Sequence, residues 1–253
     1  MMWKAIGQST TGTSHTAAGK GCEDAIQYRI LTDADGNETL ICCISDGAGS
    51  TKYGGFASAY TTQKALDTLA FSFGNKEEVT EAEIYAMVED IYDGLLIEAE
   101  AQNEELNEYS CTMLGCYITG DRAVFFQIGD GAIIRDDGSG FYTTLWWPHN
   151  GEYQNTTSFL IDDNTFSHLH ITILEENVQE IAMFTDGLQM LALSMESNTV
   201  HQPFFTDLFT VLRKADDEHK LSVLNRKLAE YLDSKQINDR TDDDKTLFLA
   251  TRS

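Results

Sequence analysis

The chain has 253 residues, 42% of them hydrophobic, with 41 acidic against 17 basic residues and a formal net charge of −24. This apolar content is enough for a sizeable core, and the presence of only two prolines with no low-complexity linker predicts a single domain over residues 1–253. So acidic a chain repels nucleic acids and anionic membranes, and we expect neither as a partner.

The number and spacing of the cysteines indicate whether the protein works in a reducing or an oxidising compartment. Their number is odd, no Cys-x-x-Cys pair occurs, and most of them lie in apolar runs, so we expect reduced thiols rather than disulfides. The start of the chain has no apolar signal segment and no run is long enough to span a membrane, which predicts a cytoplasmic protein. The cysteines are Cys22, Cys42, Cys43, Cys111 and Cys116.

The first elements are short. Residues 2–8 suit an edge strand, and residues 9–21, rich in Ser, Thr, Gly and Ala, suit a loop that carries His15 and Lys20. Strand 26–32 leads to 33–37, which begins like an EF-hand calcium loop. Ile44 holds the twelfth position, where that loop needs Glu, so we expect a hairpin turn instead.

The stretch Ile41–Gly55 is the most informative. Residues 40–45 form an apolar run that suits a buried strand, the glycine-containing segment from Asp46 to Ser50 suits a turn, and a helix is expected over 54–73. Alone, Asp46-Gly47 is more often a simple turn. A carboxylate at the end of a buried strand and before a helix nevertheless suits a hard cation or a phosphate.

The remaining elements come in blocks. Thr80 and Glu83 form a capping box that opens a second long helix, ending between 103 and 107. Short turns then separate several strands, which predicts an antiparallel meander. Residues 146–163 are polar and aromatic; they suit either a surface loop, such as a flap over a substrate, or a pair of strands. The strands are expected at 111–118, 123–128, 132–135, 141–145, 168–173, 180–185 and 246–250, and further helices at 188–194, 203–214 and 220–233.

This order predicts an α+β fold. Strands and helices occur in blocks rather than in strict alternation, which favours two antiparallel sheets packed as a sandwich with helices on both sides, a four-layer αββα arrangement, over a doubly wound parallel sheet.

Carboxylates recur at the ends of predicted strands. Asp130 follows strand 123–128 between two glycines, Asp186-Gly187 follows strand 180–185, and Asp242, Asp243 and Asp244 precede the last strand. Together with Asp46 they suggest one acidic cluster assembled by the fold. Such a cluster needs cations, or some of its members must stay protonated.

In this order the acidic motifs resemble those of the PP2C (PPM) family of metal-dependent protein serine/threonine phosphatases, in its compact bacterial form, over residues 14–250. The resemblance implies two Mg²⁺ or Mn²⁺ ions, with Asp46 bridging them, and a third, weaker site at Asp130. Asp243 heads a segment similar to the family's Asp-Asn-x-Thr, with Asp242 and Asp244 as alternatives. The implied metal ligands are Glu23, Asp24, Asp46, the Gly47 carbonyl, Asp130, Asp186 and Asp243.

The donor chemistry agrees with this resemblance. Carboxylate and carbonyl oxygens suit Mg²⁺ or Mn²⁺ rather than zinc. Two such ions about 3.5–4 Å apart can share a hydroxide that attacks phosphorus in line.

The chain departs from many eukaryotic members of the family at the turn. Ala48 stands where they have a histidine that protonates the leaving group, and Ser50 replaces the second glycine of their Gly-Gly pair. We therefore consider His15 as the general acid and Lys20 as a phosphate-binding residue. The alternative for His15 is an exposed loop histidine.

The main hypothesis is a metal-dependent phosphatase that hydrolyses phosphoserine and phosphothreonine in proteins, opposes a cognate kinase and acts as a monomer. An alternative is a catalytically weak or inactive PP2C-like module that binds phosphoproteins. Its motivation is Ala48, together with Gly131, which stands where the family usually has a serine after Gly-Asp. Hydrolysis of a small phosphorylated metabolite is a third hypothesis, which the lack of a visible basic anion pocket disfavours.

Overall fold

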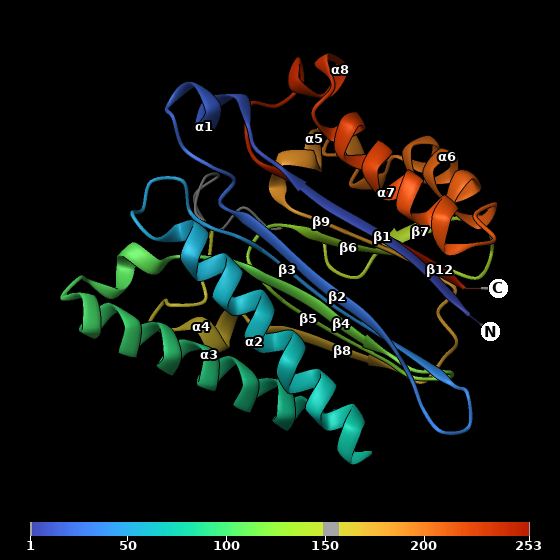
Figure 1. Cartoon of the computed structure of the whole chain (residues 1–253), viewed down its shortest axis with the longest axis horizontal. Helices are drawn as coiled ribbons and strands as arrows, with labels where there is room; N and C mark the ends of the chain where they lie inside the picture. Colours follow the sequence, from blue (N-terminus) through green and yellow to red (C-terminus); the bar gives the residue numbers. More distant parts are fainter. Residues whose placement is uncertain (1, 149–156, 253) are drawn as a thin grey trace. The chain divides into compact units, whose positions relative to one another are not determined.

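The computed structural model describes residues 2–148 and 157–252, which form two compact units (Figure 1). We name them by their place in the chain. The terminal unit comprises Met1–Cys22, Gly131–Trp147 and Val178–Ser253, and the central unit comprises Glu23–Asp130 and Pro148–Asn177.

The central unit is built on a five-stranded sheet in which every neighbouring pair is antiparallel. Apolar and β-branched residues fill its middle strands, which are buried along their whole length. The strands, in their order across the sheet, are β2 (Asp24–Thr32), β3 (Glu38–Asp46), β4 (Met113–Ile118), β5 (Ala123–Ile128) and β8 (His170–Leu174).

Two long helices cover one face of this sheet, as Figure 1 shows. They are α2 (Gly54–Asn75) and α3 (Glu81–Gln102). The capping box expected at Thr80 is present, and α3 ends at Asn103, which takes the left-handed conformation typical of helix ends. Two short helices complete the unit, η1 (Leu106–Tyr109) and α4 (Thr165–His168).

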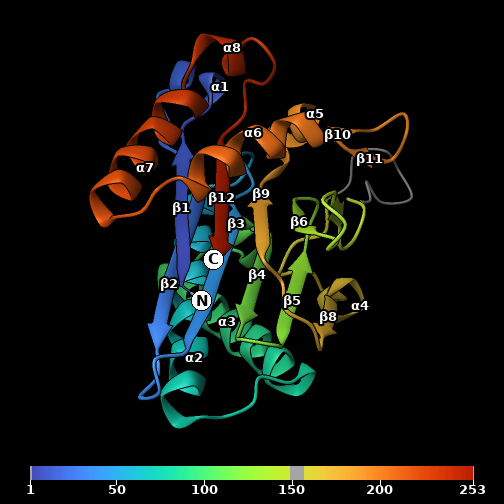
Figure 2. The ribbon, with the colours of Figure 1, turned by 90° about the vertical axis from the view of Figure 1, so that its right-hand side faces the viewer.

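The terminal unit contains a second antiparallel sheet of five strands (Figure 2). The first and last long strands of the chain pair along their full length, so residues from the two ends of the sequence lie side by side. The strand order is β1 (Trp3–Thr10), β12 (Lys245–Arg252), β9 (Glu180–Phe184), β6 (Ala132–Asp136) and β7 (Tyr142–Thr144).

Amphipathic helices pack on this second sheet. The apolar face of α6 (Gln202–Arg213) buries Phe205 and Phe209 against strand residues such as Phe184. The other elements are α1 (Thr13–Ala17), η2 (Asp186–Leu188), α5 (Gln189–Ala192), β10 (Leu193–Ser194), β11 (Thr199–Val200), α7 (Glu218–Leu232) and α8 (Lys235–Asn238).

Most predicted elements are present, and the α+β class with two antiparallel sheets and helices is confirmed. The hairpin at 33–37 is also confirmed, because it joins the paired strands β2 and β3. Residues 9–21 are not all loop, since β1 extends to Thr10 and α1 follows. Of segment 146–163, residues 149–156 lie outside the described residues. No helix in the described part of the chain is long and apolar enough to cross a membrane.

Candidate functional site

Two acidic residues face each other at one end of the central sheet. Asp24 is the first residue of β2 and Asp46 the last of β3, and the antiparallel register makes them direct partners. Glu23 precedes Asp24, and its carbonyl accepts a hydrogen bond from the Gly47 N–H at 3.1 Å. Pairing of β2 with β3 thus brings Glu23, Asp24, Asp46 and Gly47 to the same corner.

Asp46 is held there by its main chain. Its N–H donates to the Thr112 hydroxyl at 3.0 Å, and its carbonyl accepts the Thr112 N–H at 2.8 Å. These two hydrogen bonds fix the main chain from which the Asp46 side chain extends. The sequence does not identify Thr112 as a partner of Asp46, since the two residues are far apart in the chain.

Gly47 is required by close packing. A Cβ added to it would lie 2.2 Å from the Gly54 carbonyl oxygen and 2.8 Å from that of Glu23. The first turn of α2 therefore sits directly on the Asp46-Gly47 turn. This explains why a glycine follows Asp46, independently of any ligand.

Asp130 lies at the same end of the central sheet. It follows β5, whose last residue, Ile128, pairs with the first residue of β4, Met113. One carboxylate oxygen, Oδ2, accepts a hydrogen bond from the Thr157 hydroxyl at 2.7 Å. The strand order places β4 between Asp130 and the corner that holds Asp46.

In the terminal unit, the segment after β9 meets the segment before β12. Asp186 opens η2, and a Cβ added to Gly187 would lie 2.0 Å from the Asp244 carbonyl oxygen. The backbones of 186–187 and 243–244 are therefore in contact. Sequence analysis predicted one acidic cluster that also includes Asp46 and Asp130, and that cluster stays a prediction; within this unit the main-chain segments that carry Asp186 and Asp244 are in contact.

Asp244 is engaged by two groups from the start of the chain. Its Oδ1 accepts the Gly12 N–H at 2.6 Å, and its Oδ2 lies 2.9 Å from Nδ1 of His15. The Asp244 side chain is 2% exposed and that of His15 is 12% exposed. His15 is therefore not the exposed loop histidine of the alternative interpretation. Sequence analysis did not anticipate Asp244 as its partner.

Asp243 is oriented differently from Asp244. Its Oδ1 accepts the Asp244 N–H at 2.8 Å. Burial raises the pKa of Asp243; this hydrogen bond opposes the rise, and the nearby charge of Asp244 adds to it. Lys20, the predicted phosphate-binding residue, is exposed just after α1, and its N–H donates to the His15 carbonyl at 2.9 Å.

The carboxylates at the end of the central sheet, and those between β9 and β12 in the terminal unit, are donors that fit a hard divalent cation. Within residues 2–148 and 157–252, no group of three or more His, Cys, Asp or Glu side chains is arranged to hold a metal ion. The available donors are nevertheless carboxylate and carbonyl oxygens, the ligands that Mg²⁺ and Mn²⁺ take. Gly47 itself is buried against the main chain of Gly54 and Glu23.

Two antiparallel sheets with helices, and acidic residues at the ends of several strands, place the chain among α+β proteins that gather carboxylates at strand ends. The chain belongs to the protein phosphatase 2C family, whose model matches residues 11–233. It is 37% identical over 251 residues to serine/threonine-protein phosphatase 3 of Escherichia coli K12, covering 99% of this chain and 98% of that protein.

Solved structures show the same fold. Serine/threonine phosphatase Stp1 from Staphylococcus aureus superposes with a TM-score of 0.62 at 17% identity, covering 100% of this chain and 96% of that one. A complex of RsbX with magnesium gives a TM-score of 0.56 at 16% identity, covering 99% and 96%. At such identities the likeness concerns the fold alone.

Proposed function

We propose that the chain is a Mg²⁺- or Mn²⁺-dependent phosphatase that hydrolyses phosphoserine and phosphothreonine in proteins. The observation that carries the proposal is the direct pairing of Asp24 with Asp46 at the edge of the central sheet. Membership of the protein phosphatase 2C family and the relative named a serine/threonine-protein phosphatase support the same activity.

In this proposal the ligands for two divalent ions are Glu23, Asp24, Asp46 and the Gly47 carbonyl of the central unit, and Asp186 and Asp243 of the terminal unit. Asp130 of the central unit is proposed for a third, weaker site. When bound, such ions activate water as a nucleophile and offset the charge of the phosphoryl oxygens. Asp243 is the proposed ligand, and Asp244 is proposed to position His15, because its carboxylate accepts the Gly12 N–H and lies against the His15 ring.

His15 is the proposed general acid. Its Nδ1 faces Asp244, and its Nε2 is the nitrogen proposed to deliver a proton to the departing serine or threonine oxygen. Lys20, five residues further on and exposed, is the proposed contact to the phosphoryl oxygens. Ala48 leaves no imidazole at the turn, so the proton has to come from another element.

The proposed partners are a phosphorylated protein and the kinase that opposes this chain. The protein acts as a monomeric single domain in a reducing compartment such as the cytoplasm. The five free cysteines, four of them buried, support that compartment.

The test is hydrolysis of p-nitrophenyl phosphate and of a phosphothreonine peptide in EDTA, in Mg²⁺ and in Mn²⁺, by the full chain and by the Asp46→Ala and Asp186→Ala variants. We expect turnover only with metal and none in either variant, with far-UV circular dichroism unchanged. Undiminished activity in both variants, or activity in EDTA, would contradict the proposal.

The same assay separates the alternatives. Binding of the phosphopeptide without release of phosphate in saturating Mn²⁺ would indicate a binding module. Much faster turnover of a sugar or nucleotide phosphate than of the peptide would indicate a metabolite phosphatase.

A further inference from the structure

A second candidate site lies in the central unit, in a cavity of about 640 Å³ at the end of α2. Its walls come from the hairpin between β2 and β3, from the last residues of α2 with the turn that follows, and from one residue each of β3 and β4. The volume is within the range typical of small-molecule pockets, roughly 300–1,000 Å³.

The β3 and β4 residues of this cavity, Thr39 and Tyr117, lie on the same face of the central sheet. Ile41 and Tyr117 are direct partners in the register, and Thr39 precedes Ile41 by two residues, so the three side chains point to one side. Ile41 and Tyr117 belong to the core that α2 and α3 cover, and Phe73 of α2 packs against that core. The cavity therefore combines the rings of Phe73 and Tyr117 with two hydroxyl groups.

These two hydroxyl groups have no protein partner. Thr39 is 5% exposed and Tyr117 is 6% exposed, and both line the cavity. In the part of the chain that the structure describes, neither hydroxyl makes a hydrogen bond to another residue. A hydroxyl that is almost fully buried costs free energy when it stays unpaired. A polar ligand in the cavity would supply the missing partners.

Negative charge surrounds the two hydroxyls. Among the described residues that line the cavity, four carboxylates face the single ammonium group of Lys76. Glu78 pairs with Arg122 at 3.3 Å. Within the same described residues, Asp35 has no ion pair, and Glu77 accepts only a neutral side-chain amide at 3.3 Å. The last turn of α2 contains no basic residue, so the partial negative charge of the helix end adds to this field, which favours a cation.

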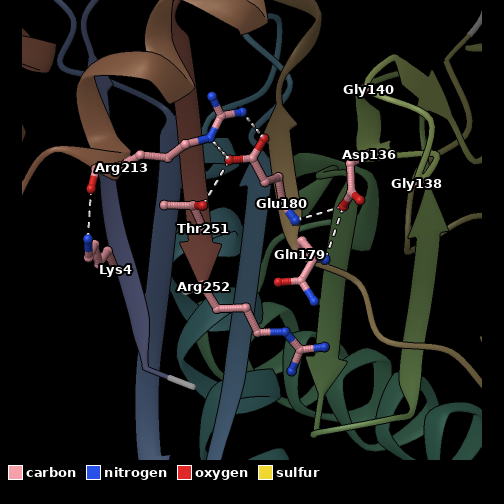
Figure 3. A pocket seen from close by; sticks show the side chains of 9 residues that line it. All are labelled: Lys4, Asp136, Gly138, Gly140, Gln179, Glu180, Arg213, Thr251 and Arg252. Carbon is pink, nitrogen blue, oxygen red and sulfur yellow. Dashed lines mark hydrogen bonds and ion pairs between the residues drawn. The ribbon is translucent and has the colours of Figure 1, made fainter.

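The cavity that Figure 3 shows, in the terminal unit, differs in this respect. There Glu180 accepts hydrogen bonds from Arg213, through Nε at 2.8 Å and Nη2 at 2.6 Å, and from the hydroxyls of Tyr142 and Thr251. The Lys4 ammonium donates to the Arg213 carbonyl at 2.8 Å. These groups bind one another, so they need no ligand.

The cavity of the central unit is distant from the proposed metal ligands of that unit. Thr39 is the second residue of β3 and Asp46 is its last. Seven residues at about 3.3 Å each separate them by roughly 23 Å. Charges this far apart are largely screened at physiological ionic strength, because the Debye length is about 8 Å. Binding here is therefore independent of the metal-dependent activity proposed above.

We propose that this cavity binds a linear aliphatic polyamine. Its ammonium groups donate to the hydroxyls of Thr39 and Tyr117 and pair with the carboxylates of Asp35 and Glu77. The rings of Phe73 and Tyr117 contact the methylene groups and attract the cationic ends. A cavity of this size, with aromatic walls and neutral hydroxyl oxygens, suits an extended organic cation better than a bare metal ion.

The test is isothermal titration calorimetry of the full chain with spermidine and with n-butylamine, in EDTA and 0.15 M NaCl as about physiological ionic strength. We expect spermidine to bind, and n-butylamine to bind at least about tenfold more weakly, because one ammonium group meets only part of the acidic wall. Loss of spermidine binding in an equal concentration of Mg²⁺, without EDTA, would identify a site for inorganic cations and would overturn the proposal.

Tyr117→Phe removes one hydroxyl and keeps the ring. It should weaken spermidine binding about tenfold, the effect of losing a hydrogen bond to a charged group. Asp35→Asn removes one exposed carboxylate of the hairpin and should weaken binding up to about fivefold, as expected for an exposed ion pair. The second variant keeps the test decisive if the first fails to fold.

Glu100→Gln is the matched control. Glu100 is exposed near the end of α3, roughly 30 Å along that helix from its start beside Glu77, so the variant loses the same charge away from the cavity. It should bind spermidine as the wild type does. Equal weakening by Glu100→Gln and Asp35→Asn would mean a general attraction to an acidic protein. That result, full affinity in Tyr117→Phe, or no binding of spermidine by the wild type would each refute the polyamine site.

Discussion

Nδ1 of His15 lies 2.9 Å from Oδ2 of Asp244, although 229 positions separate the two residues in the sequence. Asp244 also accepts the Gly12 N–H, so one carboxylate fixes both the helix α1 and the ring that it carries. If His15 protonates the leaving group, its loss should matter most where the leaving group is poor.

We therefore predict that His15→Gln lowers kcat on a phosphothreonine peptide by roughly 100-fold, a typical contribution of a general acid. Turnover of p-nitrophenyl phosphate, whose leaving group needs no proton, should fall much less. Asp244→Asn should show the same pattern with a smaller loss, because it weakens the hold on the ring without removing it. Equal losses on both substrates would mean that His15 has only a structural role.

The pairing of Asp24 with Asp46 leads to a prediction about stability. Directly opposite like charges on neighbouring strands are destabilising. Asp46→Asn should therefore raise the melting temperature in EDTA, while removing the stabilisation that metal gives. In the wild type this stabilisation should be about 2.7 kcal/mol at a metal concentration a hundredfold above Kd.

Asp67→Asn is a suitable control for this experiment. Asp67 lies on α2, is half exposed and pairs with Arg29, so the variant changes the net charge equally at a distance from the strand ends. It should respond to metal as the wild type does. A lower melting temperature of Asp46→Asn in EDTA would contradict the repulsion argument.

The sequence predicted the elements better than their contacts. Hydrophobic periodicity marks α2, α3 and the central strands, because these elements bury one or both faces. The helix α1 has no such signal. None of its five residues is fully buried, and long-range hydrogen bonds hold it, such as that from the Ser14 N–H to the Asp242 carbonyl.

Long-range contacts also limited what the sequence could predict about the candidate site. Each Asp-Gly turn was visible in the sequence, and the register that places Asp24 opposite Asp46 follows from a hairpin whose turn was recognised. The resemblance favoured Asp243 over Asp242 and Asp244 as the metal ligand, but the contacts of Asp244 with Gly12 and His15 are long-range and could not be read from the sequence. The pairing of β1 with β12 was not visible in the sequence, because these strands are at opposite ends of the chain.

The close approach at Gly187 leads to a third prediction. A Cβ there would lie 2.0 Å from the Asp244 carbonyl oxygen, so one of the two backbone segments would have to move. Gly187→Ala should cost roughly 1–3 kcal/mol of unfolding free energy, as overpacking usually does. It should also lower turnover, because the shift displaces Asp186 relative to Asp243.

Gly74→Ala provides the opposite case. Gly74 lies near the end of α2 with no atom within 4 Å of an added Cβ. Alanine should stabilise this helix by about 0.5–1 kcal/mol. Urea denaturation of both variants measures the two effects, and a Gly187→Ala variant as stable as the wild type would show that the contact with Asp244 relaxes without cost.

The Glu180 cluster predicts a dependence of stability on pH. Burial alone would raise the pKa of Glu180, but hydrogen bonds from Arg213, Tyr142 and Thr251 outweigh it and hold the pKa below its usual value. A depressed carboxyl pKa stabilises the fold above the unfolded-state pKa of about 4.3, and this stabilisation is lost as the pH falls through the folded-state pKa.

Glu180→Gln should accordingly lower the free energy of unfolding at pH 7 by about 1.5–3 kcal/mol, the usual worth of hydrogen bonds to a charged group. The difference from the wild type should shrink as the pH is lowered below about 4.3, because the wild-type carboxyl then becomes protonated too. Urea titrations between pH 3 and pH 7 measure this, with the exposed Glu230→Gln on α7 as control. A difference that stays constant over this range would show that Glu180 stabilises the unit through packing and not through its charge.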